Sequence, residues 1–234
     1  GEKIKVSVKQ ARLGNVIVYF LGNKRFHRDN GAPSIQQAEL LSRGSLEVIK
    51  VLGIKPDVIN ANDWHTALAP FYLKTVYKND PFFKETASIY TIHNLAYQGV
   101  IDKSIQEQII RITKECIPEE EIKQNPVLSM LLEKYSRGKG FTLMELGVCF
   151  ADKINAVSQK YTQEILTKEG GEGLEDILNL RKDDLVGITN GINYKVWKPE
   201  GRKKERKLLL QKELSLEINA DRPIVGIISR IAHQ

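Results

Sequence analysis

The chain has few residues of the kinds that build disulfide-linked or membrane-spanning proteins. It contains only two cysteines, Cys116 and Cys149, far apart and without a C-x-x-C partner. That pattern favours thiols in a reducing compartment over a disulfide or a zinc site. No apolar stretch approaches the ~20 residues that span a bilayer. No signal-peptide pattern opens the chain. We therefore expect a cytoplasmic protein without a membrane partner.

The composition also lacks the marks of disordered and nucleic-acid-binding proteins. Of the 234 residues, 41% are hydrophobic and 27% are charged, with a net charge of +6, which is typical of a globular domain. The one dense basic run, residues 201–207, has no interleaved aromatic side chains that would stack on bases. We expect this run to be a solvated helix or linker face, and we expect no nucleic-acid partner.

Short apolar runs alternate with helical patterns along the chain. A hairpin is predicted from residues 3–9 and 16–21, which are joined at Gly14 and Asn15. Further strands are predicted at residues 57–61, 87–92, 153–157, 184–189 and 223–229. Helices are predicted at residues 34–52, 66–77, 104–150 (with breaks near Pro118, Pro126 and Gly138), 158–168 and 202–214. This alternation predicts an α/β fold, a Rossmann-like parallel sheet with helices on both faces.

A change of composition near residue 200 divides the chain. Pro199, Gly201 and the basic run separate two patterned regions. We expect residues 1–200 to form one domain. Residues 201–234 would then supply a linker helix and the first strand of a second domain.

Polar side chains directly follow four of the predicted strands. The strand at residues 57–61 is followed by Asn62, Asp63, Trp64 and His65, and the strand at residues 87–92 by His93 and Asn94. The strand at residues 184–189 is followed by Asn190 and Gly191, and the strand at residues 223–229 by Arg230. The carboxyl ends of parallel strands lie along one edge, and open α/β sheets bind ligands in the crevice outside that edge. The sequence therefore predicts a binding site at this edge.

Each of these residues also has a purely structural interpretation. Asp63 or His65 would cap the helix that follows, and Trp64 would belong to the core. The pair Asn190-Gly191 is a common tight turn. It is their joint placement that favours a functional edge.

The same positions carry the motifs of a known enzyme family. Residues 62–65 (NDWH), with Ala69-Pro70 downstream, resemble the N-D-W-H…P segment of bacterial glycogen synthases and plant starch synthases. Residues 93–99 (HNLAYQG) are similar to their H-N-L-x-Y-Q-G signature. Further matches are residues 151–158 to A-D-x-x-x-x-V-S, residues 189–199 to N-G-I-D-x-x-x-W-x-P, and Ser229-Arg230 to the start of S-R-x-x-x-Q-K-G. The resemblance covers nearly the whole chain in the family's order.

The resemblance implies a GT-B fold, in which two Rossmann-like domains enclose the active site. Such enzymes transfer glucose from ADP-glucose to the non-reducing end of an α-1,4-glucan and retain the anomeric configuration. The expected partners are therefore a nucleotide sugar and an α-1,4-glucan. No cofactor and no metal are expected, and the sequence agrees in having no D-x-D motif.

By the same resemblance, the catalytic roles fall to His93, Asp63 and Arg230. His93 would lie beside the transferred glucose, and Asp63 would fix hydroxyl groups or contribute negative potential near the developing oxocarbenium. The guanidinium of Arg230 would face the departing diphosphate, because it is always charged and forks onto phosphate oxygens. The expected substrate-binding residues are Asn94, Trp64, His65, Tyr97, Gln98, Asn190 and Gly191.

Several departures from the family pattern keep alternatives open. The K-x-G-G-L-G-D loop is absent, and the chain stops at Gln234, where the family continues. We therefore expect a fragment that is incomplete at both ends and inactive on its own. Glu145 replaces the usual lysine and Asn193 the usual aspartate. The alternatives are a non-catalytic glucan-binding remnant, or pseudoenzyme, and a related GT-B transferase with another donor or acceptor.

Overall fold

The computed structural model describes residues 4–23, 34–198 and 201–229. It divides the chain into two compact units, unit 1 (Gly1–Thr189) and unit 2 (Asn190–Gln234). The division falls near the change of composition at residue 200. The assignment of residues 1–200 and 201–234 to two domains of a larger enzyme stays a prediction.

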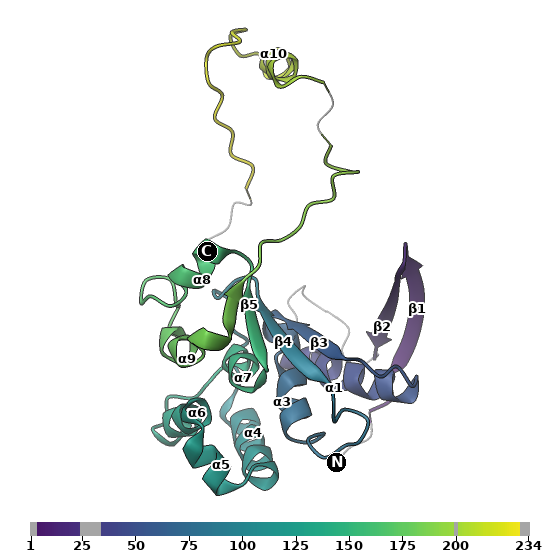
Figure 1. The fold of residues 1–234 in the computed structure, drawn as a ribbon, viewed down its shortest axis with the longest axis vertical. Helices are drawn as coiled ribbons and strands as arrows, with labels where there is room; N and C mark the ends of the chain where they lie inside the picture. Colours follow the sequence, from purple (N-terminus) through teal and green to yellow (C-terminus); the bar gives the residue numbers. More distant parts are fainter. Residues whose placement is uncertain (1–3, 24–33, 199–200, 230–234) are drawn as a thin grey trace. The chain divides into compact units, whose positions relative to one another are not determined.

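Unit 1 is built on a parallel sheet of four strands (Figure 1). The strands lie side by side in chain order: β3 (Val58–Asn62), β4 (Ala87–Ile92), β5 (Lys153–Ala156) and β6 (Leu185–Gly187). Each is parallel to its neighbour. Parallel neighbours need crossover connections, and helices supply them here. The expected α/β class is confirmed.

Helices precede and connect the strands, and most lie close to where the sequence predicts. Before β3 lies α1 (Ile35–Val51). Between β3 and β4, where one helix was predicted at residues 66–77, lie two, α2 (Asp63–Thr66) and α3 (Leu68–Lys74). Between β4 and β5 lie α4 (Lys103–Cys116), α5 (Glu119–Gln124), α6 (Pro126–Ser136) and α7 (Leu143–Phe150). Between β5 and β6 lie α8 (Gln159–Glu164), α9 (Glu175–Leu180) and a short 3₁₀ turn, Lys182–Asp184. The long helical region breaks at the predicted prolines and glycines. The helix after Ser158 ends at Glu164, earlier than expected, and α9 was not predicted.

The core of unit 1 centres on β4 and α7. Tyr90 is fully buried in the middle of β4, and every residue of α7 is buried. A Cβ placed on Gly147 would come within 2.5 Å of the Tyr90 Cζ atom. The glycine therefore lets α7 pack directly on the tyrosine ring, which fixes the helix against the sheet.

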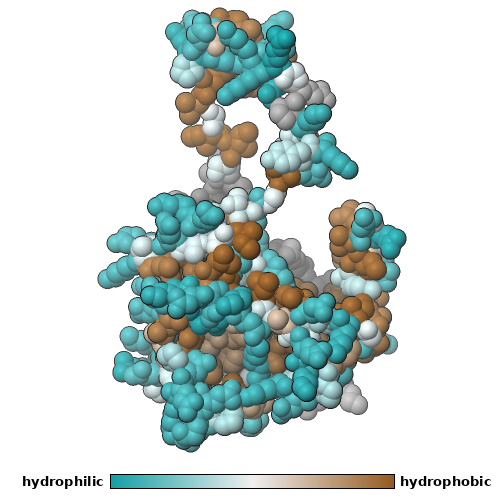
Figure 2. Space-filling model, in the orientation of Figure 1, coloured by the Kyte–Doolittle hydropathy of each residue, from teal (hydrophilic) through white to brown (hydrophobic). Residues whose placement is uncertain are grey.

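A two-stranded hairpin precedes the sheet. It pairs β1 (Ser7–Leu13) with β2 (Val16–Gly22), and Gly14 turns the chain with φ of +60°. The two-residue turn pairs Leu13 with Val16, so the first strand runs up to the turn rather than ending at residue 9. Brown, apolar surface marks this hairpin in Figure 2. Its exposed apolar side chains include those of Leu13 and Phe20.

Unit 2 contains one helix, α10 (Lys203–Glu213), among its described residues. The strand predicted at residues 223–229 is not formed there, so that prediction is wrong. Val225, Ile227 and Ile228 are almost fully exposed. An apolar run becomes a strand only beside a partner that completes its hydrogen-bond ladder, and the described residues of unit 2 provide none. Within the described ranges, no helix has the length and apolar character needed to cross a bilayer.

Candidate functional site

The carboxyl edge of the sheet brings the first two predicted motifs together. Asn62 ends β3, and His93 directly follows β4. These strands are parallel and adjacent, with Asn62 opposite Thr91. Residues that are distant in sequence therefore meet at this edge, as the sequence predicts.

Asp63 makes the bond that joins the two motifs. Its Oδ1 accepts a hydrogen bond of 2.8 Å from the backbone N–H of His93. Asp63 also adopts a left-handed backbone with φ of +52°. Such a conformation costs on the order of 1 kcal/mol or more in a non-glycine residue, and it occurs preferentially at functional sites. The capping interpretation of Asp63 is not supported, because Asn62 holds the cap position and no side chain caps α2.

The ring of His93 is exposed at the edge and is held from one side. Its Nε2 lies 3.0 Å from Asn62 Oδ1. Asn62 Nδ2 donates to the Asn60 carbonyl, which turns Oδ1 toward the ring. Because Asn62 Oδ1 is an acceptor, this contact favours the tautomer with hydrogen on Nε2. The described residues give Nδ1 no hydrogen bond. The sequence placed Asn62 at this edge but gave it no role, and the structure makes it a contact of His93.

Residues 93–99, termed the edge loop here, are held by their own side chains. Asn94 Oδ1 accepts from the Ala96 N–H at 2.9 Å. Gln98 Nε2 donates to the Glu172 carbonyl at 2.9 Å. Tyr97 is 58% exposed. The structure thus gives Asn94 and Gln98 contacts within the protein, and their roles in substrate binding stay predictions, as does that of Tyr97.

The far end of the edge loop is attached to α7. The carbonyls of Gln98 and Gly99 accept from the N–H groups of Met144 and Leu143, each at 3.0 Å. Because these N–H groups belong to the first turn of α7, the loop satisfies donors that a helix otherwise leaves unpaired.

Trp64 and His65 pack beside the edge loop. Their rings stack with centroids 4.0 Å apart and an angle of 26° between the planes. Trp64 is half-buried against the core and lies close to Gly99. The His65 carbonyl accepts from the Ser42 hydroxyl at 3.4 Å. Trp64 therefore has a packing role, and the predicted sugar contacts of both residues remain untested.

Two tyrosines lie near the charge of Asp63. Burial raises the pKa of the Tyr90 hydroxyl well above its usual value, and the Asp63 carboxylate raises it further. Burial also raises the pKa of Tyr161, the Leu95 N–H opposes that shift, and Asp63 adds to it. Both phenols therefore stay neutral at physiological pH. Sequence reasoning missed Tyr161, because nothing local links α8 to the edge loop.

The remaining predicted residues lie outside unit 1. Asn190 and Gly191 belong to unit 2 and are exposed. Arg230 lies outside the described residues. Asn193 accepts from the Lys195 N–H through its side chain at 3.0 Å, which forms a local turn.

Glu145 is a structural carboxylate. Its side chain is buried and pairs with Lys134 Nζ at 2.7 Å. Its other oxygen accepts from the Thr142 N–H at 2.8 Å and completes a capping box on α7. The charge reversal relative to the family is therefore balanced inside unit 1.

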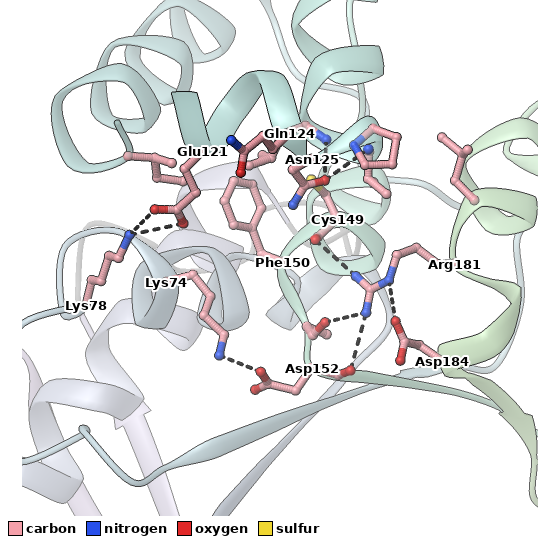
Figure 3. A pocket seen from close by; sticks show the side chains of 16 residues that line it. Lys74, Lys78, Glu121, Gln124, Asn125, Cys149, Phe150, Asp152, Arg181 and Asp184 are labelled. Carbon is pink, nitrogen blue, oxygen red and sulfur yellow. Dashed lines mark hydrogen bonds and ion pairs between the residues drawn. The ribbon is translucent and has the colours of Figure 1, made fainter. Parts of the chain in front are cut away.

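A hollow of about 630 Å³ lies at the opposite, amino edge of the sheet (Figure 3). Its charged residues satisfy one another: Lys74 with Asp152, Lys78 with Glu121, and Arg181 with Asp184. Arg181 also donates to four carbonyls, those of Val148 and Cys149 in the last turn of α7 and those of Ala151 and Asp152 between α7 and β5. This hollow is therefore a structural junction, apart from the predicted motifs.

Neither cysteine is in a disulfide, and Cys149 is buried. Burial raises the pKa of the Cys149 thiol to about 12, which keeps it protonated and unreactive. Across the described ranges, no three His, Cys, Asp or Glu side chains are grouped so that they would hold a metal ion.

Comparison with known proteins gives consistent matches. Residues 1–180 match the sequence profile of the starch synthase catalytic domain. Glycogen synthase from Thermosipho africanus is 39% identical over 218 residues, covering 87% of this chain and 42% of the relative. Glycogen synthase from Thermotoga petrophila is 36% identical, covering 94% of this chain and 46% of the relative. The chain thus spans a little under half the length of these two relatives.

A solved structure shows the same fold. The catalytic domain of starch synthase IV from Arabidopsis thaliana, bound to ADP and acarbose, superposes with a TM-score of 0.69 at 23% identity. The match covers 93% of this chain and 46% of that structure. It confirms the fold expected from the sequence, the Rossmann-like domain of a GT-B protein.

Proposed function

Because the chain belongs to the starch synthase catalytic domain family, we propose that it forms most of the first domain of a glucosyltransferase. The enzyme transfers glucose from ADP-glucose to the non-reducing end of an α-1,4-glucan, with retention of configuration. The observation that carries the proposal is the hydrogen bond from the His93 N–H to Asp63, which joins the two motifs at the carboxyl edge.

The chemistry of transfer suits the groups at this edge. As the glycosidic bond to phosphate breaks, positive charge builds at the anomeric carbon and negative charge on the diphosphate. The Asp63 carboxylate supplies negative potential, and its bond to His93 holds that residue beside the transferred glucose. We assign the diphosphate to the guanidinium of Arg230 and the nucleotide sugar to Asn190 and Gly191.

The acceptor is assigned to the surface around the edge loop. Asn94, Tyr97, Gln98, Trp64 and His65 supply hydroxyl, amide and ring groups of the kinds that bind sugars. Tyr97 is the most exposed large hydrophobic side chain among them. We propose adenine as the donor base, since the Arabidopsis thaliana relative is described as bound to ADP. The transfer as proposed needs no metal. A cytoplasmic location is proposed because both cysteines are unpaired.

The test is a transfer assay with the complete protein that carries this chain. The protein is incubated with glycogen and radiolabelled ADP-glucose, with UDP-glucose in a parallel reaction. We expect label in glycogen from ADP-glucose, released again by an enzyme that cleaves α-1,4 linkages. A heat-inactivated sample sets the background.

Two outcomes would contradict the proposal in different ways. Glycogen that co-sediments with the protein but gains no label from either donor would indicate a non-catalytic glucan-binding protein. Transfer from UDP-glucose alone would refute the donor assignment and leave the reaction class intact.

A further inference from the structure

The middle of the edge loop is held by one residue from a distant element. The Leu95 N–H donates to the hydroxyl oxygen of Tyr161 at 3.1 Å, across 66 positions of sequence. Leu95 lies between Asn94 and the loop's exposed residues, and its side chain is only 1% exposed. The loop is thus fixed at its start by Asp63, at its end by α7, and in between by Tyr161.

Tyr161 is itself held firmly in place. It lies in the first turn of α8, and its N–H donates to the Ser158 hydroxyl at 2.9 Å. Ser158 caps α8 just beyond the end of β5. The tyrosine ring is half-buried against the core. A phenol anchored in this way is a fixed acceptor for the amide that it meets.

The Tyr161 hydroxyl stays neutral while its oxygen accepts the Leu95 N–H. Burial raises the pKa of Tyr161, and the Leu95 N–H acts against that rise without cancelling it. The neutral phenol oxygen accepts from Leu95 throughout the physiological pH range. Replacing the hydroxyl by hydrogen would keep the ring and leave the amide of a buried residue without this partner.

We infer that Tyr161 is a positioning residue of the proposed active site. Its hydroxyl fixes the backbone at Leu95, and so holds His93 where the transferred glucose binds and Asn94 where the acceptor binds. This inference rests on the proposed function. A misplacement of about 1 Å in a reacting geometry costs up to about 100-fold in rate, so one loop hydrogen bond matters more for turnover than for stability.

The experiment compares Tyr161→Phe with Tyr135→Phe in the complete protein. Tyr135 is also half-buried, on α6, but the described residues give its hydroxyl no hydrogen bond. We expect Tyr161→Phe to lower kcat about tenfold and to leave KM for ADP-glucose at the wild-type value. The unfolding midpoint should fall only slightly, by the effect of one lost hydrogen bond. Tyr135→Phe should match wild type in all three quantities.

Hydrogen exchange of the Leu95 amide supplies a readout that does not depend on activity. We expect this amide to exchange faster in Tyr161→Phe, with the amides of the sheet strands much less affected. Wild-type kcat in Tyr161→Phe, or a loss of kcat that disappears once the rate is divided by the folded fraction, would overturn the inference. If the wild-type protein transfers no glucose, the proposed function fails, and unchanged exchange at Leu95 would separately refute the positioning role.

Discussion

At the scale of single residues, Asp63 and Gly99 both adopt left-handed backbones, with φ of +52° and +67°. This backbone is strained in Asp63, and it places the carboxylate where it accepts from the His93 N–H. At position 99 glycine is needed for a second reason besides its backbone. A Cβ there would lie 2.8 Å from Cε3 of Trp64 and 3.1 Å from Cβ of Leu143. The glycine lets the edge loop pass close to the tryptophan ring.

We predict that Gly99→Ala destabilises the protein more than Gly53→Ala. Both glycines have φ of +67°, but a Cβ on Gly53 would meet nothing within 4 Å. Gly53→Ala should therefore show the backbone cost alone, about 1 kcal/mol, and Gly99→Ala should add a steric cost of about 1–3 kcal/mol. Urea unfolding of the two variants measures the difference. Equal losses would show that the Trp64 contact does not restrict this position.

The positions of Asp63 and His93 at the carboxyl edge were predictable from the sequence, but their contacts and the part played by Tyr161 were not. Asp63 and His93 were found because each lies just beyond the end of an apolar strand, which is a local pattern. The Tyr161–Leu95 bond and the Trp64–Gly99 contact join distant segments, so no local pattern marks them. The contact between Asn62 and His93 was likewise not predictable, because it exists only once β3 and β4 are neighbours.

At the scale of helices and strands, boundaries set by local bonds were predicted well. Ser34 and Gln37 form a capping box that starts α1, and Gly53 follows its end with positive φ. Ser158 caps α8 through the Tyr161 N–H. The strand predicted at residues 223–229 is not formed, because a strand needs a pairing partner that the local sequence does not supply.

Asp152 connects three elements at the amino edge of the sheet. Its carboxylate pairs with Lys74 at the end of α3 and accepts from the N–H and hydroxyl of Ser88 on β4. Partial burial acts to raise the pKa of Asp152, but Lys74 and Ser88 outweigh it and leave the pKa below its usual value. The charged form is therefore preferred in the folded protein.

We predict that Asp152 makes stability depend on pH in the acid range. A carboxyl group whose pKa is lowered on folding contributes stability above its unfolded pKa of about 3.9. That contribution is lost as pH falls through the lower folded pKa. The free-energy difference between wild type and Asp152→Asn should thus be constant near neutrality and shrink below about pH 4.

Asp183→Asn is the matched control for this measurement. Asp183 makes no ion pair among the described residues. Its substitution should leave the pH dependence of urea unfolding unchanged. The assigned role would be contradicted if the free energies of unfolding of wild type and Asp152→Asn changed in parallel with pH down to about pH 3.

At the scale of the whole molecule, the chain supplies one wall of the proposed site. It spans under half of the length of the Thermosipho africanus and Thermotoga petrophila relatives. Within unit 1 the two edges of the parallel sheet differ in their chemistry. The carboxyl edge carries His93, exposed and bonded to Asp63, and the amino edge carries a hollow whose charges are paired with one another.

The central claim is that function resides at the carboxyl edge, and a comparison of the two edges tests it most directly. Glucosyl transfer and the unfolding midpoint are measured for His93→Ala and for Lys78→Ala, which removes one partner of an ion pair in the amino-edge hollow. We predict that His93→Ala lowers kcat on the order of 10² with an unchanged midpoint. Lys78→Ala should stay within about twofold of wild type, since such a pair contributes little. Near-normal turnover in His93→Ala together with a strong loss in Lys78→Ala would contradict the account.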